Sequence, residues 1–481
     1  MRLRVLKADL WMSQATTRLP FRFGKTTMTW APILLAQVEV EDEQGTRSSG
    51  FASDLLVPRW FDKNPSKSPR DNVRDLLESA RRAVEAVTSV ASSTLPVFDL
   101  WRQTYQACFE APEARGMEPL VRGFGVALLE RALIDAACRG AGVSFFQALK
   151  QNLFGFEAAA LHTELAGWDL GQSLPERARA AVEVRHTVGL LDPLRTSDIP
   201  AEERLNDGLP QALDDIIRHY GLSCFKVKLS GSLENDRERL PAIAEVFKDT
   251  VRGNLRITVD ANEQYDDLAD LVRLFEELSR RPEGRRLLQA MLYVEQPLPR
   301  AMSFDPARVE PLRRLSAFAP VMIDEADSDI EAFKRGVACG YRGVSIKNCK
   351  GVFRSFANRG LCEVYSREGR GGFFQSAEDL TNLPVIPLQQ DLATVAAHGL
   401  THVERNGHHY FRGLRHLPSE EAREALGAHP DLYEETEAGI VLKIRNGKIE
   451  INSLDTPGYG YNVAVLAESR TPAQSWEFPN P

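Results

Sequence analysis

From about residue 184 onward, short strand-like runs alternate with amphipathic helical segments, and this alternation constrains the fold more than any other feature of the sequence. Parallel strands joined by helical crossovers produce such a rhythm, which places the chain in the α/β class. A set of eight runs favours a closed (β/α)₈ barrel of the TIM type over an open Rossmann sheet. No G-x-G-x-x-G follows any run, so the usual dinucleotide site is not expected. The predicted strands lie at 187–191, 224–229, 256–259, 291–294, 321–323, 343–346, 373–375 and 400–403.

The chain before the barrel predicts a separate α+β domain. Residues 33–40 form a strand-like run, 70–90 and 126–138 have helical spacing, and the loop at 58–69 contains three prolines. After residue 417 the alternation stops, and the runs 440–444 and 448–451 flank Asn446-Gly447, a strong β-hairpin signal. We therefore predict an α+β domain at 1–140, a connecting segment at 141–185, a barrel at 186–417 and a tail at 418–481 that returns to the first domain.

Composition excludes several classes of function. Hydrophobic residues make up 43% of the 481 residues, enough for a sizeable core. The net charge of −8 and the absence of a basic stretch disfavour binding to nucleic acid or to an anionic membrane. No run of about 18 apolar residues occurs, so no membrane span is expected. The six cysteines are scattered without a C-x-x-C pair, as expected for reduced thiols, and we predict a cytoplasmic protein.

Three consecutive predicted strands each end in an acid. Asp260, Glu295 and Asp324 directly follow the runs at 256–259, 291–294 and 321–323. Barrel strands lie about 5 Å apart, so three carboxylates at this edge would repel one another unless a cation lay among them. Oxygen ligands favour Mg²⁺, with Mn²⁺ possible. The alternative is that these acids cap the helices that follow.

Lysines occupy the strand ends on either side of the acids. Lys226 and Lys228 alternate with Val227, so they face the same side of their strand. Lys347 directly follows the run at 343–346. An edge strand exposed to solvent could also carry alternating lysines, but a barrel has no such edge. A neighbouring ammonium and a nearby Mg²⁺ would both lower the pKa of a lysine toward the range of a general base. The set is therefore typical of a site that removes a proton next to a carboxylate.

Five motifs in this order resemble those of the enolase superfamily, in its muconate-lactonizing-enzyme and mandelate-racemase-like group with a Lys–Lys pair. They are FKVKL (225–229), VDANE (259–263), VEQPL (294–298), IDEA (323–326) and SIKNCKG (345–351). The resemblance covers most of the chain and implies that the α+β domain and the tail form a capping domain. It also implies Mg²⁺ ligands at Asp260, Glu295 and Asp324, an acid/base pair at Lys228 and Lys347, and an electrostatic role for Lys226.

The same resemblance suggests further contacts with the substrate. Asn262 would line the site beside the metal. Glu404, in the HVER segment at 402–405, matches a glutamate that contacts the substrate carboxylate in mandelate racemase, although a helix-cap or surface role is the alternative. Loops of the capping domain at 21–28 and 53–61 would close over the substrate. Candidate residues in these loops are Arg22, Lys25, Arg59 and Trp60.

These features predict a Mg²⁺-dependent enzyme that removes the α-proton of a small carboxylate substrate and then racemises, epimerises or cycloisomerises the resulting enolate. One alternative is an acid-sugar dehydratase of the same superfamily. The segment QSAE at 375–378 argues against it, because the seventh-strand histidine of mandelate racemase is missing there. The other alternative is a non-catalytic metal-binding homologue. We also expect a homo-oligomer.

Overall fold

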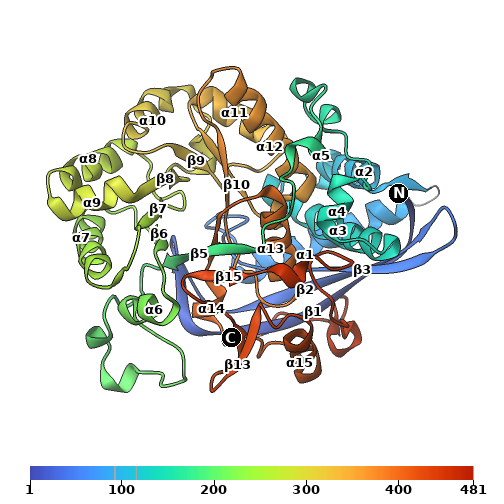
Figure 1. Cartoon of the computed structure of the whole chain (residues 1–481). Coiled ribbons are helices and arrows are strands. Elements are labelled where there is room, and N and C mark those ends of the chain that lie inside the picture. The colour runs from blue at the N-terminus through green and yellow to red at the C-terminus, as the bar shows by residue number, and fades with distance from the viewer. Residues whose placement is uncertain (91–93, 115, 480–481) are drawn as a thin grey trace.

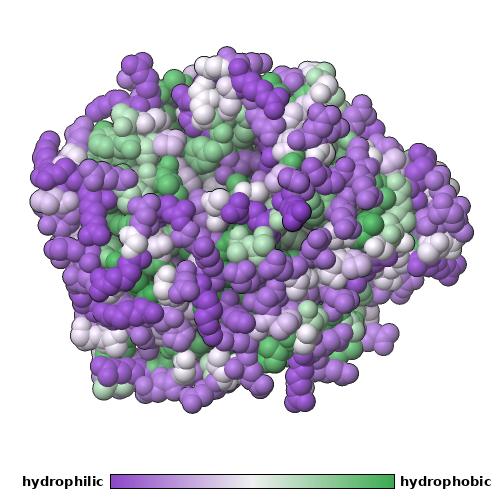
Figure 2. Space-filling model, in the orientation of Figure 1, coloured by the Kyte–Doolittle hydropathy of each residue, from purple (hydrophilic) through white to green (hydrophobic). Residues whose placement is uncertain are grey.

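The computed structural model describes residues 1–90, 94–114 and 116–479 of the chain (Figure 1). Two sheets organise it, a parallel barrel and an antiparallel sheet built mainly from the N-terminal residues. Among the described residues, no helix is both long and apolar enough to cross a membrane. All six cysteines are buried and free. Figure 2 shows that the apolar patches on this face are small and scattered among hydrophilic side chains.

The predicted barrel is confirmed. Eight strands pair in parallel in the order of the sequence, and the last strand pairs with the first, which closes the sheet. Apart from the short β9, they are four to eight residues long and largely buried, as expected for strands covered on both faces. They are β5 (Ala181–Val188), β6 (Cys224–Lys228), β7 (Arg256–Asp260), β8 (Met291–Glu295), β9 (Val321–Ile323), β10 (Gly343–Ile346), β11 (Phe374–Ala377) and β12 (His402–Arg405).

The first barrel strand begins earlier than predicted. The sequence favoured 187–191, but β5 runs from Ala181 to Val188, so it begins within what was expected to be the connecting segment at 141–185. The polar side chains of Arg185 and His186 disguised it, yet both are fully buried. Arg185 faces the barrel interior, where carboxylate and hydroxyl groups bind it, so its charge does not exclude it from a strand.

Helices surround the barrel (Figure 1). Helix α8 buries one apolar face, in which Leu271, Val272 and Phe275 are among the buried residues. The helices are α6 (Leu213–Tyr220), α7 (Leu233–Thr250), α8 (Leu268–Ser279), α9 (Pro282–Ala290), α10 (Val309–Leu315), α11 (Ala332–Cys339), α12 (Val352–Arg367), α13 (Ile386–His398) and α14 (Gly407–Tyr410).

The N-terminal residues form the predicted α+β unit. Its antiparallel sheet has the order β16-β1-β2-β3, with β4 beside β1. Gly50 of β3 allows the sheet to approach the longest helix, because a Cβ there would lie 2.1 Å from the carbonyl oxygen of Ala132. The elements are β1 (Arg2–Phe23), β2 (Thr26–Asp42), β3 (Arg47–Leu55), β4 (Leu95–Pro96), β16 (Thr471–Pro472), α1 (Pro69–Ser89), α2 (Val97–Glu110) and α3 (Pro119–Ala141).

Short helices connect this unit to the barrel. They are α4 (Phe145–Lys150) and α5 (Leu170–Ser173), with 3₁₀ turns at Ala158–Ala160 and Thr163–Leu165 between them. The connection lies against α12, since Trp168 Nε1 and Ser173 Oγ both donate hydrogen bonds to the Glu363 carboxylate. The segment therefore packs on the barrel instead of spanning solvent.

The tail begins with α15 (Ser419–Ala428), and its predicted hairpin is wrong in its pairing. Asn446 and Gly447 do form a tight turn, and both have a positive φ. The strands on either side of the turn do not pair with each other. Instead, β14 (Gly439–Leu442) pairs with β13 (Tyr433–Thr436), and β15 (Lys448–Glu450) pairs with β5. The reason is that β6 begins opposite Arg185, which leaves the first half of β5 without a partner on that side. The last strand, β16, returns to β1 as predicted.

Candidate active site

The predicted lysines and acids lie together at the carboxyl ends of five consecutive barrel strands. Lys226 and Lys228 lie on β6, and Asp260 and Glu295 end β7 and β8, while Asp324 and Lys347 directly follow β9 and β10. The three acids are 0% exposed and none of the three lysines is more than 6% exposed. Strand alternation directs these side chains into the barrel interior, so neighbouring strands bring them into contact.

Lys226 is surrounded by carboxylates. Its Nζ lies 3.0 Å from Asp260, 2.8 Å from Glu295, 2.8 Å from Glu378 and 2.9 Å from Glu404. Burial alone would lower the pKa of Lys226, but Asp260 and Glu295 outweigh burial and raise it well above the ordinary value. The surrounding carboxylates therefore stabilise Lys226 as an ammonium, which suits the electrostatic role that the resemblance implies.

Lys228 and Lys347 each bind one of the outer acids. Lys228 Nζ is 2.5 Å from Asp260, and Lys347 Nζ is 2.6 Å from Asp324. Burial lowers the pKa of Lys347, but Asp324 reverses the shift and raises it above the ordinary value. Burial likewise favours a higher pKa for Asp324, yet Lys347 and Lys350 hold it well below its usual range. Charged amines thus lie on both sides of the acid-bearing strands.

The donor set fits a hard divalent cation. It contains carboxylate oxygens alone, and Oε2 of Glu295 forms an ion pair with Lys226 at 2.8 Å but accepts no well-directed hydrogen bond. Burial and then the Asp260 charge raise the pKa of Glu295 well above its ordinary value, so a positive charge added beside this carboxylate would stabilise its ionised form. Among the described residues, no group of three or more His, Cys, Asp or Glu side chains is arranged to hold a metal ion. In this site the amines of Lys228 and Lys347 bind the carboxylates of Asp260 and Asp324 instead.

Asn262 positions Asp260. The residue has a left-handed backbone, with φ of 44°, and its N–H donates to Oδ1 of Asp260 over 2.8 Å. Its side-chain amide donates to Glu325 at 3.2 Å, and its carbonyl oxygen accepts a 2.7 Å hydrogen bond from Lys63. The side chain of Asn262 therefore points toward a second buried acid beside the three predicted ligands.

Glu404 is buried and is held on both oxygens. It accepts hydrogen bonds from Thr187 Oγ1 at 2.7 Å, from Lys226 at 2.9 Å and from the N–H of Asp379 at 2.8 Å. Burial raises its pKa, but the charges of Lys226 and Lys228 outweigh burial and lower it well below the ordinary value. The surface role that the sequence left open is excluded by this burial.

A group of four residues below the lysines was missed by sequence reasoning. Glu378 accepts from Lys226 and from the Tyr293 hydroxyl at 2.7 Å, and Arg185 binds Glu378, Tyr293 and Ser376. Arg185 lies on β5, Tyr293 on β8 and Ser376 on β11, and Glu378 directly follows β11. No local sequence motif therefore links the four residues. The only local signal was Glu378 in the QSAE segment. Its counter-ion, Arg185, which stabilises a buried acid at that position, lies almost 200 residues earlier in the sequence.

The loop at 60–63 covers this site from the N-terminal unit. The Trp60 ring lies over Lys347, with Nζ 4.4 Å from the ring centroid. Arg300, which follows β8, donates to the carbonyl oxygens of Trp60 and Phe61 at 2.8 Å each and also binds Glu263. Of the other capping-loop candidates, Arg22 is exposed, while Lys25 and Arg59 line a neighbouring cavity.

A second contact from the N-terminal unit positions the loop of Lys347. The buried carboxylate of Glu130, on α3, accepts from the N–H groups of Val352 and Phe353 at the start of α12. Helix N-termini favour such an acceptor. Burial raises the pKa of Glu130 to about 7. Helix α12 begins five residues after Lys347. The contact of Glu130 therefore fixes the segment that follows the candidate lysine against α3.

Comparison with solved structures relates the fold to known proteins. No family model matches the sequence, and no curated protein matches it. Among solved structures, an enolase from Bradyrhizobium complexed with magnesium and mandelic acid has a TM-score of 0.58 at 15% identity, covering 98% of both chains. A dipeptide epimerase from Enterococcus faecalis V583, complexed with Mg and L-Leu-L-Tyr, has a TM-score of 0.58 at 14% identity, covering 95% of this chain and 99% of that one. A muconate lactonizing enzyme from Pseudomonas fluorescens has a TM-score of 0.57 at 16% identity, covering 97% of each.

These matches extend over nearly the whole chain. They show that the protein has the fold of these solved enolases, epimerases and lactonizing enzymes, with the barrel and the additional α+β unit together. The fold that the sequence resemblance implied is therefore confirmed.

Proposed function

We propose that this protein is a member of the enolase superfamily that binds Mg²⁺ and removes the α-proton of a carboxylate substrate. The arrangement of charges carries the proposal. Lys228 and Lys347 lie on the two strands that flank β7, β8 and β9, and each is bound to a terminal acid of that set. Proteins of this fold with mandelic acid, a dipeptide or muconolactone bound support a small carboxylate as the substrate class.

The charge balance of the site supports the same conclusion. Five of the buried acids and five buried cations are paired with one another, so a bound divalent cation would add positive charge that favours an anionic ligand. Mg²⁺ would supply positive charge beside the substrate carboxylate as negative charge develops there. The groups counted are Asp260, Glu295, Asp324, Glu378 and Glu404, with Arg185, Lys226, Lys228, Lys347 and Lys350.

The lysines act on opposite faces of the substrate in this proposal. One amine accepts the α-proton after it leaves its carboxylate partner, and the other returns a proton or shields the intermediate. Lys226 keeps its charge near the substrate carboxylate, and Asn262 keeps Asp260 oriented. Racemisation, epimerisation and cycloisomerisation all share this first half, and we propose one of these outcomes. The segment at 375–378 contains no histidine for a dehydratase mechanism, and its Glu378 accepts hydrogen bonds from Lys226 and Tyr293.

Solvent exchange tests the proposal. Candidate carboxylic acids incubated with the protein and Mg²⁺ in D₂O should gain deuterium at the α-carbon. Lys228→Ala and Lys347→Ala should each reduce exchange by at least about 100-fold, the usual contribution of a general acid or base. Lys248→Gln is the control, because Lys248 is an exposed residue of α7. Exchange that persists unchanged in both alanine variants would overturn the assignment of the base, and exchange that is insensitive to removal of Mg²⁺ would overturn the role of the metal.

A further inference from the structure

Gln296 is a buried glutamine that directly follows the candidate metal ligand Glu295 at the end of β8. Its side chain is 0% exposed, and its backbone is left-handed, with φ of 34°. A left-handed backbone is unfavourable for a residue other than glycine, and it persists only where the surrounding contacts hold it. The contacts of Gln296 come from the end of β9 and from the loops after β7, β8 and β9.

The side-chain amide of Gln296 bridges the loops after β8 and β9. Its Oε1 accepts hydrogen bonds from the backbone N–H groups of Asp324 at 2.9 Å and Ala326 at 3.1 Å. Its Nε2 donates to the Leu298 carbonyl oxygen at 2.7 Å and to Ser303 Oγ at 2.9 Å. Two N–H donors on one side and a carbonyl acceptor on the other fix the orientation of the amide. All four bonds are buried, so losing the amide would leave polar groups without partners.

Strand pairing ends before it reaches Asp324. The pairing of β8 with β9 ends with Glu295 opposite Met322, and β9 itself ends at Ile323. The N–H of Asp324 is then held by the Gln296 side chain. Because Gln296 is covalently joined to Glu295, its amide sets the spacing between the backbones of two candidate metal ligands.

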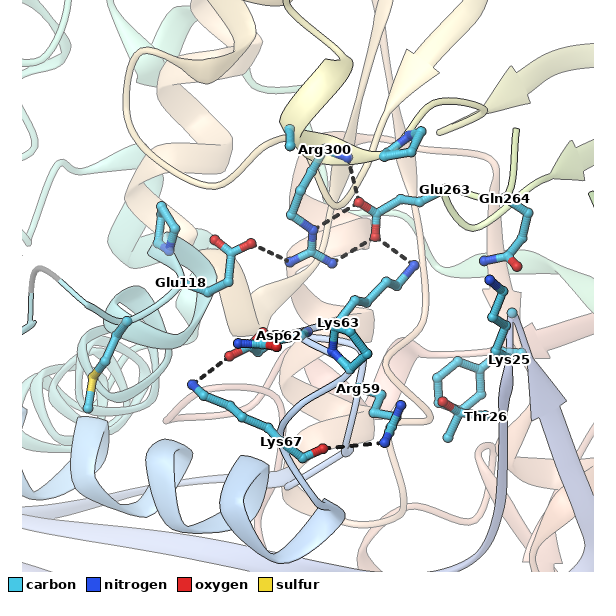
Figure 3. A pocket seen from close by; sticks show the side chains of 18 of the residues that line it. Lys25, Thr26, Arg59, Asp62, Lys63, Lys67, Glu118, Glu263, Gln264 and Arg300 are labelled. Carbon is cyan, nitrogen blue, oxygen red and sulfur yellow. Dashed lines mark hydrogen bonds and ion pairs between the residues drawn. The ribbon is translucent and has the colours of Figure 1, made fainter. Parts of the chain in front are cut away.

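The loop after β7, which follows the third candidate ligand Asp260, is joined to the same residue. The backbone N–H of Glu263 donates to the Gln296 carbonyl oxygen over 2.9 Å. The carboxylate of Glu263 is bound in turn by Arg300, from the loop after β8, and by Lys63 (Figure 3). One glutamine thus connects the three loops that follow the acid-bearing strands.

We propose that Gln296 is a positioning residue that fixes the spacing of the three carboxylates and thereby selects Mg²⁺ over the larger Ca²⁺. The presence of a metal among these carboxylates is taken from the proposed function. Mg²⁺ requires nearly ideal octahedral geometry, whereas Ca²⁺ accepts more ligands in more variable arrangements. A rigid frame around the ligands therefore favours Mg²⁺, and loosening this frame penalises Mg²⁺ more than Ca²⁺.

Metal binding in the absence of any substrate tests this role. MgCl₂ and CaCl₂ are titrated calorimetrically into the full-length protein. Gln296→Met keeps the length of the side chain but removes the four hydrogen bonds of the amide. It should weaken Mg²⁺ binding at least about tenfold, as loss of a group that orients metal ligands usually does. Ca²⁺ binding should weaken by less than about threefold, because Ca²⁺ tolerates a changed spacing.

A milder variant covers the case in which Gln296→Met does not fold. Ser303→Ala removes one of the four hydrogen bonds and leaves the amide in place. It should lower the ratio of Mg²⁺ to Ca²⁺ affinity by about threefold, in keeping with one buried hydrogen bond.

The matched control is Gln389→Met, the same substitution at a glutamine of α13 that is also 0% exposed. The Gln389 amide donates to the Gly460 carbonyl oxygen at 3.0 Å and accepts from the Tyr433 hydroxyl at 3.1 Å, so its partners belong to the C-terminal tail. Its affinity ratio should stay within about twofold of the wild type, because sites that share no partner act independently.

Amide hydrogen exchange without metal gives a second measurement. Exchange at residues 324–326 should accelerate in Gln296→Met and stay as in the wild type in Gln389→Met. Equal losses of Mg²⁺ and Ca²⁺ affinity in Gln296→Met, or an unchanged ratio in Ser303→Ala, would overturn the role of Gln296 while leaving the proposed function intact. A wild-type protein that binds no Mg²⁺ would overturn the metal in the proposed function together with this role.

Discussion

Lys226 is the residue on which the buried charges of the barrel depend. Four carboxylates lie within 3.0 Å of its ammonium nitrogen, and two of them, Glu378 and Glu404, lie more than 150 residues from Lys226 along the chain. Buried acids without a counter-ion are strongly unfavourable, because desolvation is no longer offset by attraction. Stability and the proposed chemistry therefore rest on the same side chain.

Lys226→Met should destabilise the fold by about 3–5 kcal/mol, because it leaves buried carboxylates uncompensated. Urea unfolding followed by circular dichroism measures the change. The control Lys248→Met alters an exposed ion pair on α7 and should change stability by less than about 1 kcal/mol. A Lys226→Met protein as stable as the wild type would show that the four carboxylates do not depend on this amine.

At the scale of elements, the loop at 60–63 is held over Lys347 by the barrel itself. Arg300 bonds to two successive carbonyl oxygens of this loop and is fixed by Glu263, while Lys63 binds the same carboxylate from the other side. The buried lysines have 6% exposure or less, so a substrate reaches them only when this loop moves. The strength of the Arg300 contacts then sets how often the loop opens.

Arg300→Gln should weaken the closed position of the loop by about 1–3 kcal/mol, the range for hydrogen bonds from a charged donor. Amide hydrogen exchange at residues 60–63 should accelerate accordingly. Arg335→Gln, which removes a partly exposed ion pair with Asp329, should leave exchange at 60–63 as in the wild type. Unchanged exchange in Arg300→Gln would mean that packing of Trp60 alone keeps the loop closed.

At the scale of the whole molecule, buried neutral histidines tie the barrel to the N-terminal unit. His186 of β5 and His409 of α14 lie with ring centroids 5.4 Å apart, and Arg18 of β1 donates to the His409 carbonyl oxygen. Burial and then His409 lower the pKa of His186 to about 3, and burial and then Arg18 lower the pKa of His409 to about 3. Both rings are neutral in the folded protein at neutral pH.

Stability should therefore fall as pH drops below about 6.5, where histidines of the unfolded chain gain protons that the folded protein excludes. Each buried histidine contributes a slope of about 1.4 kcal/mol per pH unit between about 6.5 and its folded pKa. Urea unfolding at pH 7 and pH 5 checks this, and His409→Gln should reduce the difference. His219→Gln, an exposed position on α6, should not. An identical pH dependence in both variants would contradict the assignment.

Much of the architecture was predictable because its signals are local. The strand runs at 256–259, 291–294 and 321–323 and the polar residue after each are features of consecutive residues, so Asp260, Glu295 and Asp324 could be placed at strand ends from the pattern alone. The alternation in FKVKL likewise directs Lys226 and Lys228 to one side. Strand periodicity and the closure of eight strands then bring these residues together without further information.

Long-range contacts decided the rest. Arg185 was taken to precede the barrel, yet Glu378 and Tyr293 make it a core residue, and β15 pairs with β5 because β6 starts too late to fill that side. Periodicity reports which way a side chain points, whereas the energy of a buried charge depends on partners hundreds of residues away, which only the folded chain assembles.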